Sequence, residues 1–202
     1  MRPVTKPVIV DYQPRWPEEF ADVRERLAAS FGDLALHIEH IGSTSVPGLA
    51  AKDVIDVQVS VASLDPQEPI ATALANAGFT ETPFGLVGDD HIPPGWEGAA
   101  PGDVWVKLFA SAPPDQRRVH VHVRVDGSPN ERYALLFRDF MRVNPSAGDA
   151  WAIFKRELAK ICDTTQDYVE VKDPATDVVM VVAEKWAEQA GWTPHGDRPA
   201  TV

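Results

Sequence analysis

The sequence has little cysteine, little positive charge and no long hydrophobic run. Cys162 is the single cysteine, so no disulfide can form within the chain, and a small buried side chain is expected there. The first 16 residues contain no apolar stretch of signal-peptide length. The longest apolar run, Val178–Ala183, falls far short of the ~20 residues of a membrane span. These absences predict a cytoplasmic protein without a membrane segment.

The charge balance is strongly acidic, with 30 Asp and Glu against 19 Lys and Arg and a formal net charge of −11. Such a surface repels phosphate backbones, so long DNA or RNA is not expected as a partner. A small phosphorylated ligand or nucleotide remains compatible, because a few local donors and a metal ion can reverse the field within one site. The length of 202 residues and the hydrophobic fraction of 44% fit one large domain.

The pattern of apolar residues predicts an α/β (α+β) fold, with strands first and helices in the last third. Alternation of apolar and polar residues is clearest in Val54–Val61. Strands are predicted at Val8–Tyr12, Leu34–Ile41, Val54–Val61, Val104–Ala110 and Val119–Val125, and helices at Pro17–Phe31, Gln67–Ala77, Pro129–Val143, Ala147–Ile161 and Asp177–Ala190.

The last four of these strands are expected to be neighbours in a mixed sheet, with a helical C-terminal section at about 129–192. We expect one domain over residues 1–192 and a loose tail at 193–202. The Pro- and Gly-rich residues 83–103 are interpreted as a long irregular loop, and such loops often cover sites. Trp96 in this loop could stack on a base.

The most informative feature is the turn formed by Gly42, Ser43, Thr44 and Ser45, followed by Asp56 in the next strand. Glycine lets backbone amides approach an anion, and the hydroxyl groups add donors. Asp56 lies on the non-aliphatic face of its strand and could hold Mg²⁺ through an oxygen. A phosphate cradle beside a metal carboxylate is the minimum needed to polarise a triphosphate. The alternative is an ordinary turn beside a surface acid.

The string HIGSTSVPGLAAK (40–52) followed by VIDV (54–57) resembles the signature of the GrpB family. Further pieces match in order: DYQPRW (11–16), HVHV (120–123), GSP (127–129), FRD (137–139) and KREL (155–158). The resemblance covers about residues 8–190. It implies a nucleotidyltransferase-like fold, because the family is placed with that superfamily. Similar domains also occur fused behind dephospho-coenzyme A kinases, but this chain has no G-x-x-x-x-G-K-[ST] loop, so that activity is not carried over.

The resemblance also implies a set of metal ligands, from which the sequence departs. The acid strand of that superfamily usually carries two carboxylates, and here Asp56 matches the first while Gln58 holds the second position. The later strand offers His120 and His122 on one face and no acid. The expected metal ligands are therefore Asp56, Gln58, His120 and His122, for Mg²⁺ or another divalent ion. The two histidines could equally be bonded to neighbours on a polar sheet face.

Three cations complete the candidate site. Lys52 stands just before the acid strand and is a candidate for both catalysis and phosphate binding, together with Lys107 and Arg138. Each could instead be a solvated or locally paired side chain.

Three functions follow from these features. The first is an enzyme that binds a nucleoside triphosphate and transfers a nucleotidyl group to a small acceptor. The second is a catalytically degenerate module that holds a nucleotide or coenzyme, which Gln58 favours. The third is a metal-dependent hydrolase using Asp56, His120 and His122.

Overall fold

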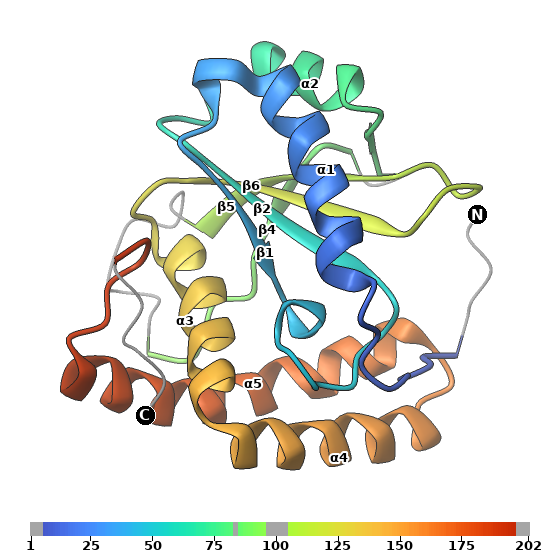
Figure 1. Cartoon of the computed structure of the whole chain (residues 1–202), viewed down its shortest axis with the longest axis vertical. Helices are drawn as coiled ribbons and strands as arrows, with labels where there is room; N and C mark the ends of the chain where they lie inside the picture. The colour runs from blue at the N-terminus through green and yellow to red at the C-terminus, as the bar shows by residue number, and fades with distance from the viewer. Residues whose placement is uncertain (1–5, 83–84, 96–104, 197–202) are drawn as a thin grey trace.

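The computed structural model describes residues 6–82, 85–95 and 105–196. Its centre is a mixed sheet with the strand order β1-β2-β6-β5-β3, and β4 also pairs with β5. Figure 1 shows this sheet between two layers of helices. The strands are β1 (His37–Ile41), β2 (Ile55–Val61), β3 (Thr80–Glu81), β4 (Val87–Asp89), β5 (Val106–Ser111) and β6 (Val119–Val125). The four longer predicted strands are therefore neighbours, as the sequence indicates.

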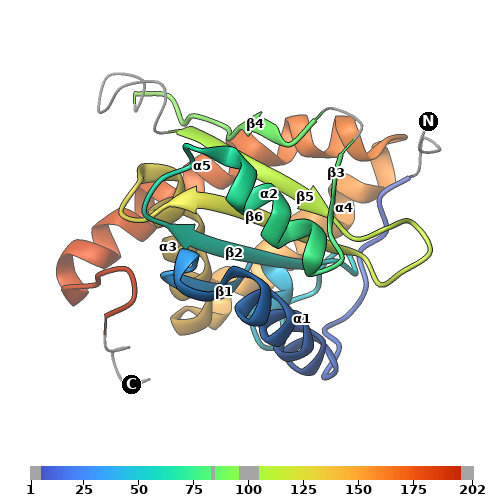
Figure 2. The same ribbon diagram turned by 90° about the horizontal axis from the view of Figure 1, so that it is seen from above.

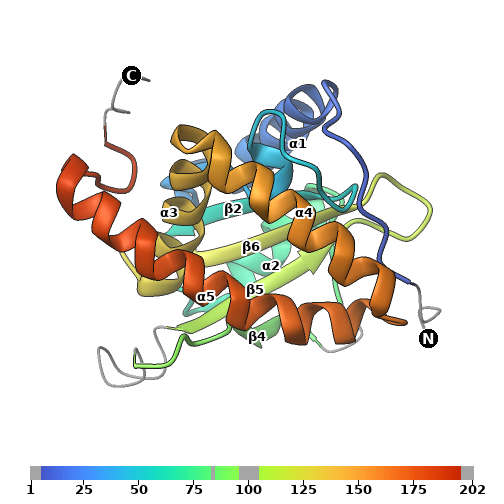
Figure 3. The same cartoon turned by 90° about the horizontal axis from the view of Figure 1, so that it is seen from below.

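The helices divide between the two faces of the sheet. They are α1 (Trp16–Phe31), α2 (Gln67–Asn76), α3 (Pro129–Val143), α4 (Pro145–Ile161) and α5 (Thr165–Ala190), with 3₁₀ turns η1 (Gly32–Leu34) and η2 (Ser43–Ser45). Seen from above, α1 and α2 cover one face (Figure 2). Seen from below, α4 and α5 cross the other face beside α3 (Figure 3). The α/β class and the helical C-terminal section are thus confirmed.

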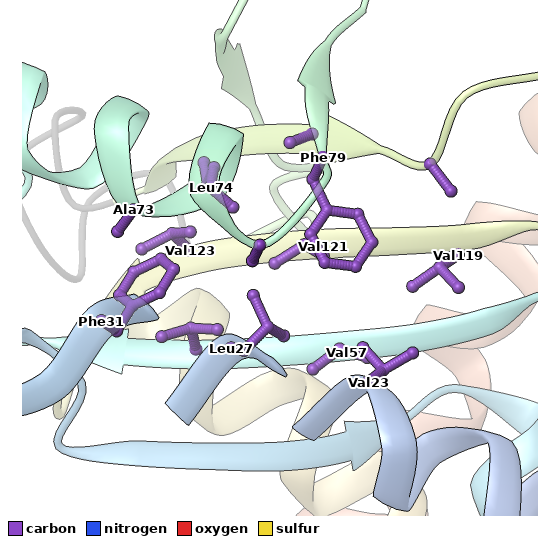
Figure 4. Close-up of a cluster of buried hydrophobic side chains, with 14 of the residues drawn as sticks. Val23, Leu27, Phe31, Val57, Ala73, Leu74, Phe79, Val119, Val121 and Val123 are labelled. Atoms are coloured by element: carbon purple, nitrogen blue, oxygen red, sulfur yellow. The ribbon is translucent and has the colours of Figure 1, made fainter. Parts of the chain in front are cut away.

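Strand alternation separates an apolar face from a polar one. The odd-numbered apolar residues of β2, from Ile55 to Val61, are at most 2% exposed and pack with Val23, Leu27 and Phe31 of α1. Val121 and Val123 of β6 continue this core (Figure 4). The opposite face of β2 carries the polar side chains, so the site must lie between the sheet and the C-terminal helices.

A second apolar cluster holds the C-terminal helices together. Leu136 of α3, Trp151 of α4 and Met180 and Ala183 of α5 are all buried within it. Cys162, at the end of α4, is buried at 6% exposure, as expected for a small apolar side chain. Within the described ranges, every helix is too short or too polar to serve as a bilayer crossing.

Several predicted boundaries are wrong. Val8–Tyr12 is not a strand and makes only an isolated bridge, between Val10 and Ala51. The predicted strand at Leu34–Ile41 begins at His37, because the residues before Ala35 form a 3₁₀ turn. The predicted irregular loop at 83–103 contains β4, which pairs with β5.

The largest difference is in α5, which begins at Thr165 rather than Asp177. Pro174 lies inside the helix, where it removes a hydrogen bond and normally favours a break. Thr164 caps the true start by accepting a hydrogen bond from the Asp167 N–H at 3.0 Å. Because buried residues such as Tyr168 and Met180 occur on both sides of the proline, packing holds the helix continuous.

Candidate functional site

A cleft of about 480 Å³ lies between the polar face of the sheet and the C-terminal helices. The strands β2, β5 and β6 supply one wall, and α3, α4 and α5 the other. Its charged and imidazole lining consists of Lys52, Asp56, Asp89, Asp90, His91, Lys107, His120, His122, Arg124, Lys155, Lys172 and Asp173. The turn residues Gly42, Ser43 and Thr44 also line it.

Asp56 stands at the centre of the polar sheet wall between two imidazoles. The parallel register of β2 and β6 sets Asp56 beside His120 and Gln58 beside His122. Nδ1 of His120 lies 3.3 Å from Oδ1 of Asp56, and Nε2 of His122 lies 3.7 Å from the same oxygen. One ligand atom from each of the three residues lies within 4.8 Å of the other two. The predicted shared face of the histidines and Asp56 is therefore present.

The protonation states of Asp56 and His122 suit a divalent ion. Burial alone would raise the pKa of Asp56, but hydrogen bonds and positive charge from His120 and His122 outweigh it and hold that pKa well below its usual range. Burial lowers the pKa of His122 to about 4, so its ring is neutral at neutral pH. Nδ1 of His122 is buried and finds no hydrogen-bond partner in the described part of the chain. An ionised carboxylate and a neutral imidazole are the forms that coordinate a metal, so the donor set fits one.

The Gly42 turn closes tightly over Asp56. Gly42 has φ +68° and ψ −174°, a region that is essentially restricted to glycine. A Cβ at this position would lie 2.8 Å from Oδ2 of Asp56. The 3₁₀ turn that follows bonds the Ser45 N–H to the Gly42 carbonyl at 3.2 Å. The first N–H groups of any helical turn have no acceptor inside the turn. In this turn they are the N–H groups of Ser43 and Thr44, two residues that line the cleft.

The two turn hydroxyls that were expected to bind phosphate have different surroundings. Thr44 is 2% exposed, and its Oγ1 donates to the carbonyl of Val54 at 3.1 Å, so this hydroxyl holds the turn to β2. Ser43 faces the cleft, where its Oγ accepts a hydrogen bond from Nζ of Lys155 at 2.8 Å. Ser43 is therefore the hydroxyl that remains placed for a ligand.

A lysine cluster, formed by Lys52, Lys155 and Lys172, lines the cleft beside the turn. Lys155 is 3% exposed and donates to the carbonyl of Ala50 as well as to Ser43. Burial and then the positive charges of Lys172 and Lys52 lower the pKa of Lys155 to about 7. Among the described residues, neither Lys52 nor Lys155 has a carboxylate within salt-bridge distance. Lys172 pairs with Asp173 at 2.7 Å, so Lys52 and Lys155 are the lysines of this cluster that are placed to attract an anion.

The sequence analysis did not assign Lys155 or Lys172 to the site. A signal for Lys155 exists, because Trp151, Ala152, Leu158 and Ala159 are all buried on α4 and lie three or four residues from it. A lysine at the centre of a helical apolar stripe is buried, and a buried lysine needs a partner. Lys172 lies in the first part of α5, before the predicted start at Asp177, and the sequence carries no signal for its place in the site.

Asp90, directly after β4, is an acid that the sequence analysis missed. It bonds Arg124 Nε at 2.7 Å and Lys107, and it accepts from Asn130 Nδ2 at 3.0 Å. Burial would raise the pKa of Asp90, but the positive charge of Arg124 outweighs it, and the pKa is lowered. Lys107 thus lines the cleft as predicted, with its charge already paired by Asp90.

Two of the candidate residues lie outside the cleft. Gln58 is fully buried, and its amide oxygen accepts from Arg124 Nη1 at 2.5 Å, so its place is in a buried polar network and not beside a metal. Arg138 is 3% exposed and bonds Glu39 at 2.5 Å and Asp139 at 2.7 Å, which commits its guanidinium on α3. Trp96 lies outside the described residues.

Comparison with known proteins identifies the group to which this mixed α/β fold and its cleft belong. A family model described as "GrpB protein" matches residues 6–181. The crystal structure of the conserved protein GrpB from Enterococcus faecalis superposes with a TM-score of 0.67 at 25% sequence identity, covering 89% of this chain and 99% of that one. The chain belongs to the GrpB family.

Two further relatives differ in how much of their own length this chain covers. The UPF0157 protein SCO7215 of Streptomyces coelicolor is 31% identical over 175 residues, which cover 87% of this chain and 81% of that protein. A dephospho-CoA kinase of Mycolicibacterium paratuberculosis is 34% identical over 197 residues, covering 92% of this chain. The chain spans only 48% of the length of that kinase.

Proposed function

We propose that this protein binds a small phosphorylated ligand, of the nucleoside triphosphate or coenzyme class, in the cleft beside a divalent cation. The observation that carries the proposal is the lysine cluster. Lys155 is buried, has a pKa lowered to about 7 and has no acidic partner among the described residues, and it lines the same cleft as a carboxylate flanked by two imidazoles. An anion beside its Nζ would stabilise the charged form, which burial otherwise disfavours.

The residues of the chain would share the work as follows. Lys155 and Lys52 would neutralise phosphate oxygens, and the Ser43 hydroxyl would donate a further hydrogen bond. The cation would be held by Asp56, His120 and His122. When bound, it would supply Lewis acidity at a phosphoryl oxygen. Two imidazoles with one carboxylate suit Mn²⁺ or Zn²⁺ better than Mg²⁺, because Mg²⁺ prefers oxygen ligands.

Hydrolysis of a phosphate ester or anhydride is the reaction that this set supports best. The oxygen of water would form the new bond to phosphorus, the bond to the leaving oxygen would break, and the leaving oxygen would take up a proton. Nucleotidyl transfer to a small acceptor is the second candidate. Gln58 disfavours it, because this residue is tied to Arg124 and brings no second carboxylate to the metal. Asp90 lines the same cleft, but its carboxylate is already paired with Arg124 and Lys107, so it does not replace the missing second acid.

The test is a panel of nucleoside triphosphates and dephospho-coenzyme A, each with Mg²⁺, Mn²⁺ or Zn²⁺. Pyrophosphate release indicates nucleotidyl transfer, orthophosphate release indicates hydrolysis, and saturable binding without product indicates a binding module. Lys155→Met should abolish all three signals. Lys160→Met is the matched control, because Lys160 lies on the same helix but its side chain is 68% exposed. If the panel gives no binding, or if Lys155→Met behaves as the control does, the proposal is wrong.

A further inference from the structure

Two histidines and an acid meet at the end of β1 opposite the Gly42 turn, outside the cleft lining. His37 begins β1 and pairs in register with Ser60, whereas Ile41 at the other end of β1 pairs with Asp56. Asp126 follows β6, and its N–H donates to the carbonyl of Val61 at 2.9 Å. Asp56 and Ser60 are four positions apart on β2, roughly 13 Å along the strand. The cleft reaches Arg124, which pairs with Ser60, but His37, Asp126 and His195 do not line it.

The second histidine, His195, comes from the segment after α5. In Figure 1 this segment rises beside α3 towards the sheet. His195 has φ +57°, a left-handed conformation that few residues other than glycine adopt. Its ring stacks on that of His37, with centroids 3.6 Å apart and planes 10° from parallel. Strain at a residue of this kind persists only where the surrounding contacts determine it.

Asp126 lies beside the stacked rings, within reach of one nitrogen of each. Its Oδ1 is 3.8 Å from Nε2 of His37 and 3.9 Å from Nε2 of His195, and ligand atoms of all three residues lie within 4.8 Å of one another. Two ligand atoms at ~2.05 Å around one tetrahedral zinc ion are about 3.4 Å apart. The three atoms are therefore somewhat farther apart than in such a site, and the parallel rings must tilt for the lone pairs of both Nε2 atoms to point at one ion.

Two further carboxylates, those of Glu39 and Glu131, lie near His195. In metal sites, a carboxylate commonly accepts a hydrogen bond from the second ring nitrogen of a histidine ligand. Oε1 of Glu39 lies 3.6 Å from Nδ1 of His195, so if Nε2 binds an ion, the other ring nitrogen has an acceptor. Oε1 of Glu131 lies 3.1 Å from Nε2 itself, and Glu131 is fully buried. Among these carboxylates in the described chain, only that of Glu39 is paired with an arginine, Arg138. The remaining negative charge around the rings favours a cation.

We propose that His37, Asp126 and His195 form a second divalent-metal site, selective for an ion of the zinc or nickel class, which fastens the segment after α5 to the sheet. Two imidazoles and a carboxylate are a donor set for such ions and a poor one for Mg²⁺ or Ca²⁺. The side chains of His37 and Asp126 are each 41% exposed, so an ion can reach them from solvent.

The experiment is calorimetric titration of the full chain with Zn²⁺ at pH 7.5, with the cleft disabled by H120A and H122A together. We expect this double variant to bind one equivalent of Zn²⁺, and to show a rise in melting temperature with the metal. Adding His37→Ala and His195→Ala should remove that equivalent and the rise. Asp126→Asn in the cleft-disabled chain should weaken binding at least tenfold, and it leaves both rings in place if the histidine substitutions disturb the fold.

Zn²⁺ binding that is unchanged by these substitutions, or no binding to the cleft-disabled chain, would overturn the proposal. Because the cleft is already disabled, this outcome is independent of whether the cleft binds phosphorylated ligands.

Discussion

Ligand binding at Lys155 should be coupled to the uptake of a proton. In the free protein, burial and the neighbouring Lys172 and Lys52 lower the pKa of Lys155 to about 7. A phosphate group beside Nζ would reverse that balance and raise the pKa back towards the usual value of a lysine. At pH 8 the free side chain is about 9% protonated, so binding takes up about 0.9 proton per ligand. At pH 6 the uptake falls to about 0.1.

The assay is calorimetric titration in buffers of different ionisation enthalpy, which gives the proton count directly. Lys155→Arg is the informative variant, because a guanidinium stays protonated and should bind the ligand with no linked uptake from this position. Wild-type protein that binds at pH 8 with the same proton count as Lys155→Arg would refute the assignment of the anion site to Lys155.

The same lowered pKa predicts how stability changes with pH. Lys155 has a pKa of about 7 when folded and about 10.5 when unfolded, so the unfolded chain binds more protons between these values. Stability should therefore rise with pH across this window, and the gap corresponds to about 5 kcal/mol in total. Lys155→Met should lack this contribution, which urea denaturation of both proteins at pH 6.5 and pH 9.5 measures. If the free energy of unfolding changes equally with pH in both proteins, Lys155 is not a buried lysine with a lowered pKa.

Three further substitutions test the turn and the acid. Gly42→Ala should lower the free energy of unfolding by about 1–3 kcal/mol or more, because φ is positive and the new Cβ meets Asp56 Oδ2. Gly48→Ala, also at positive φ but with nothing within 4 Å, should cost less; equal losses would show that the contact with Asp56 is unimportant. Asp56→Asn should abolish any metal dependence of binding or turnover while the melting temperature changes little, and retained metal dependence would exclude this ligand. Ser43→Ala should weaken triphosphate binding by roughly ten- to a hundred-fold, from the ~1.5–3 kcal/mol of one charge-assisted hydrogen bond; wild-type affinity, or an unfolded variant, would make the turn purely structural.

The sequence predicted the elements whose pattern is set by one buried face. Val119–Val125 and Pro129–Val143 have the predicted bounds, because alternation defines the first and a proline at the first turn defines the second. Pro174 misled the prediction of α5, since the cost of an internal proline is visible in the sequence and the packing that offsets it is not. The isolated bridge at Val10 shows the converse, an apolar run without a neighbouring strand to pair with.

The site was predictable only where residues are close in sequence or share a strand register. Gly42, Asp56 and the histidine pair meet because they lie on or directly after three neighbouring strands, β1, β2 and β6. Gln58 lies on the same face as Asp56, but its amide oxygen accepts a hydrogen bond from Arg124. This contact joins β2 to β6, and the sequence does not reveal that these two strands pair. Lys155 reaches Ser43 across 112 positions of the chain. Such contacts are tertiary, so a reading of local pattern cannot find them.

The most direct measurement is a crystal structure of the protein soaked with a nucleoside triphosphate and Mn²⁺, with anomalous data to locate the metal. The account predicts a manganese peak bounded by Asp56, His120 and His122, and phosphate oxygens within hydrogen-bond distance of Lys155 and Ser43. Triphosphate bound elsewhere while the cleft holds neither metal nor phosphate would contradict it.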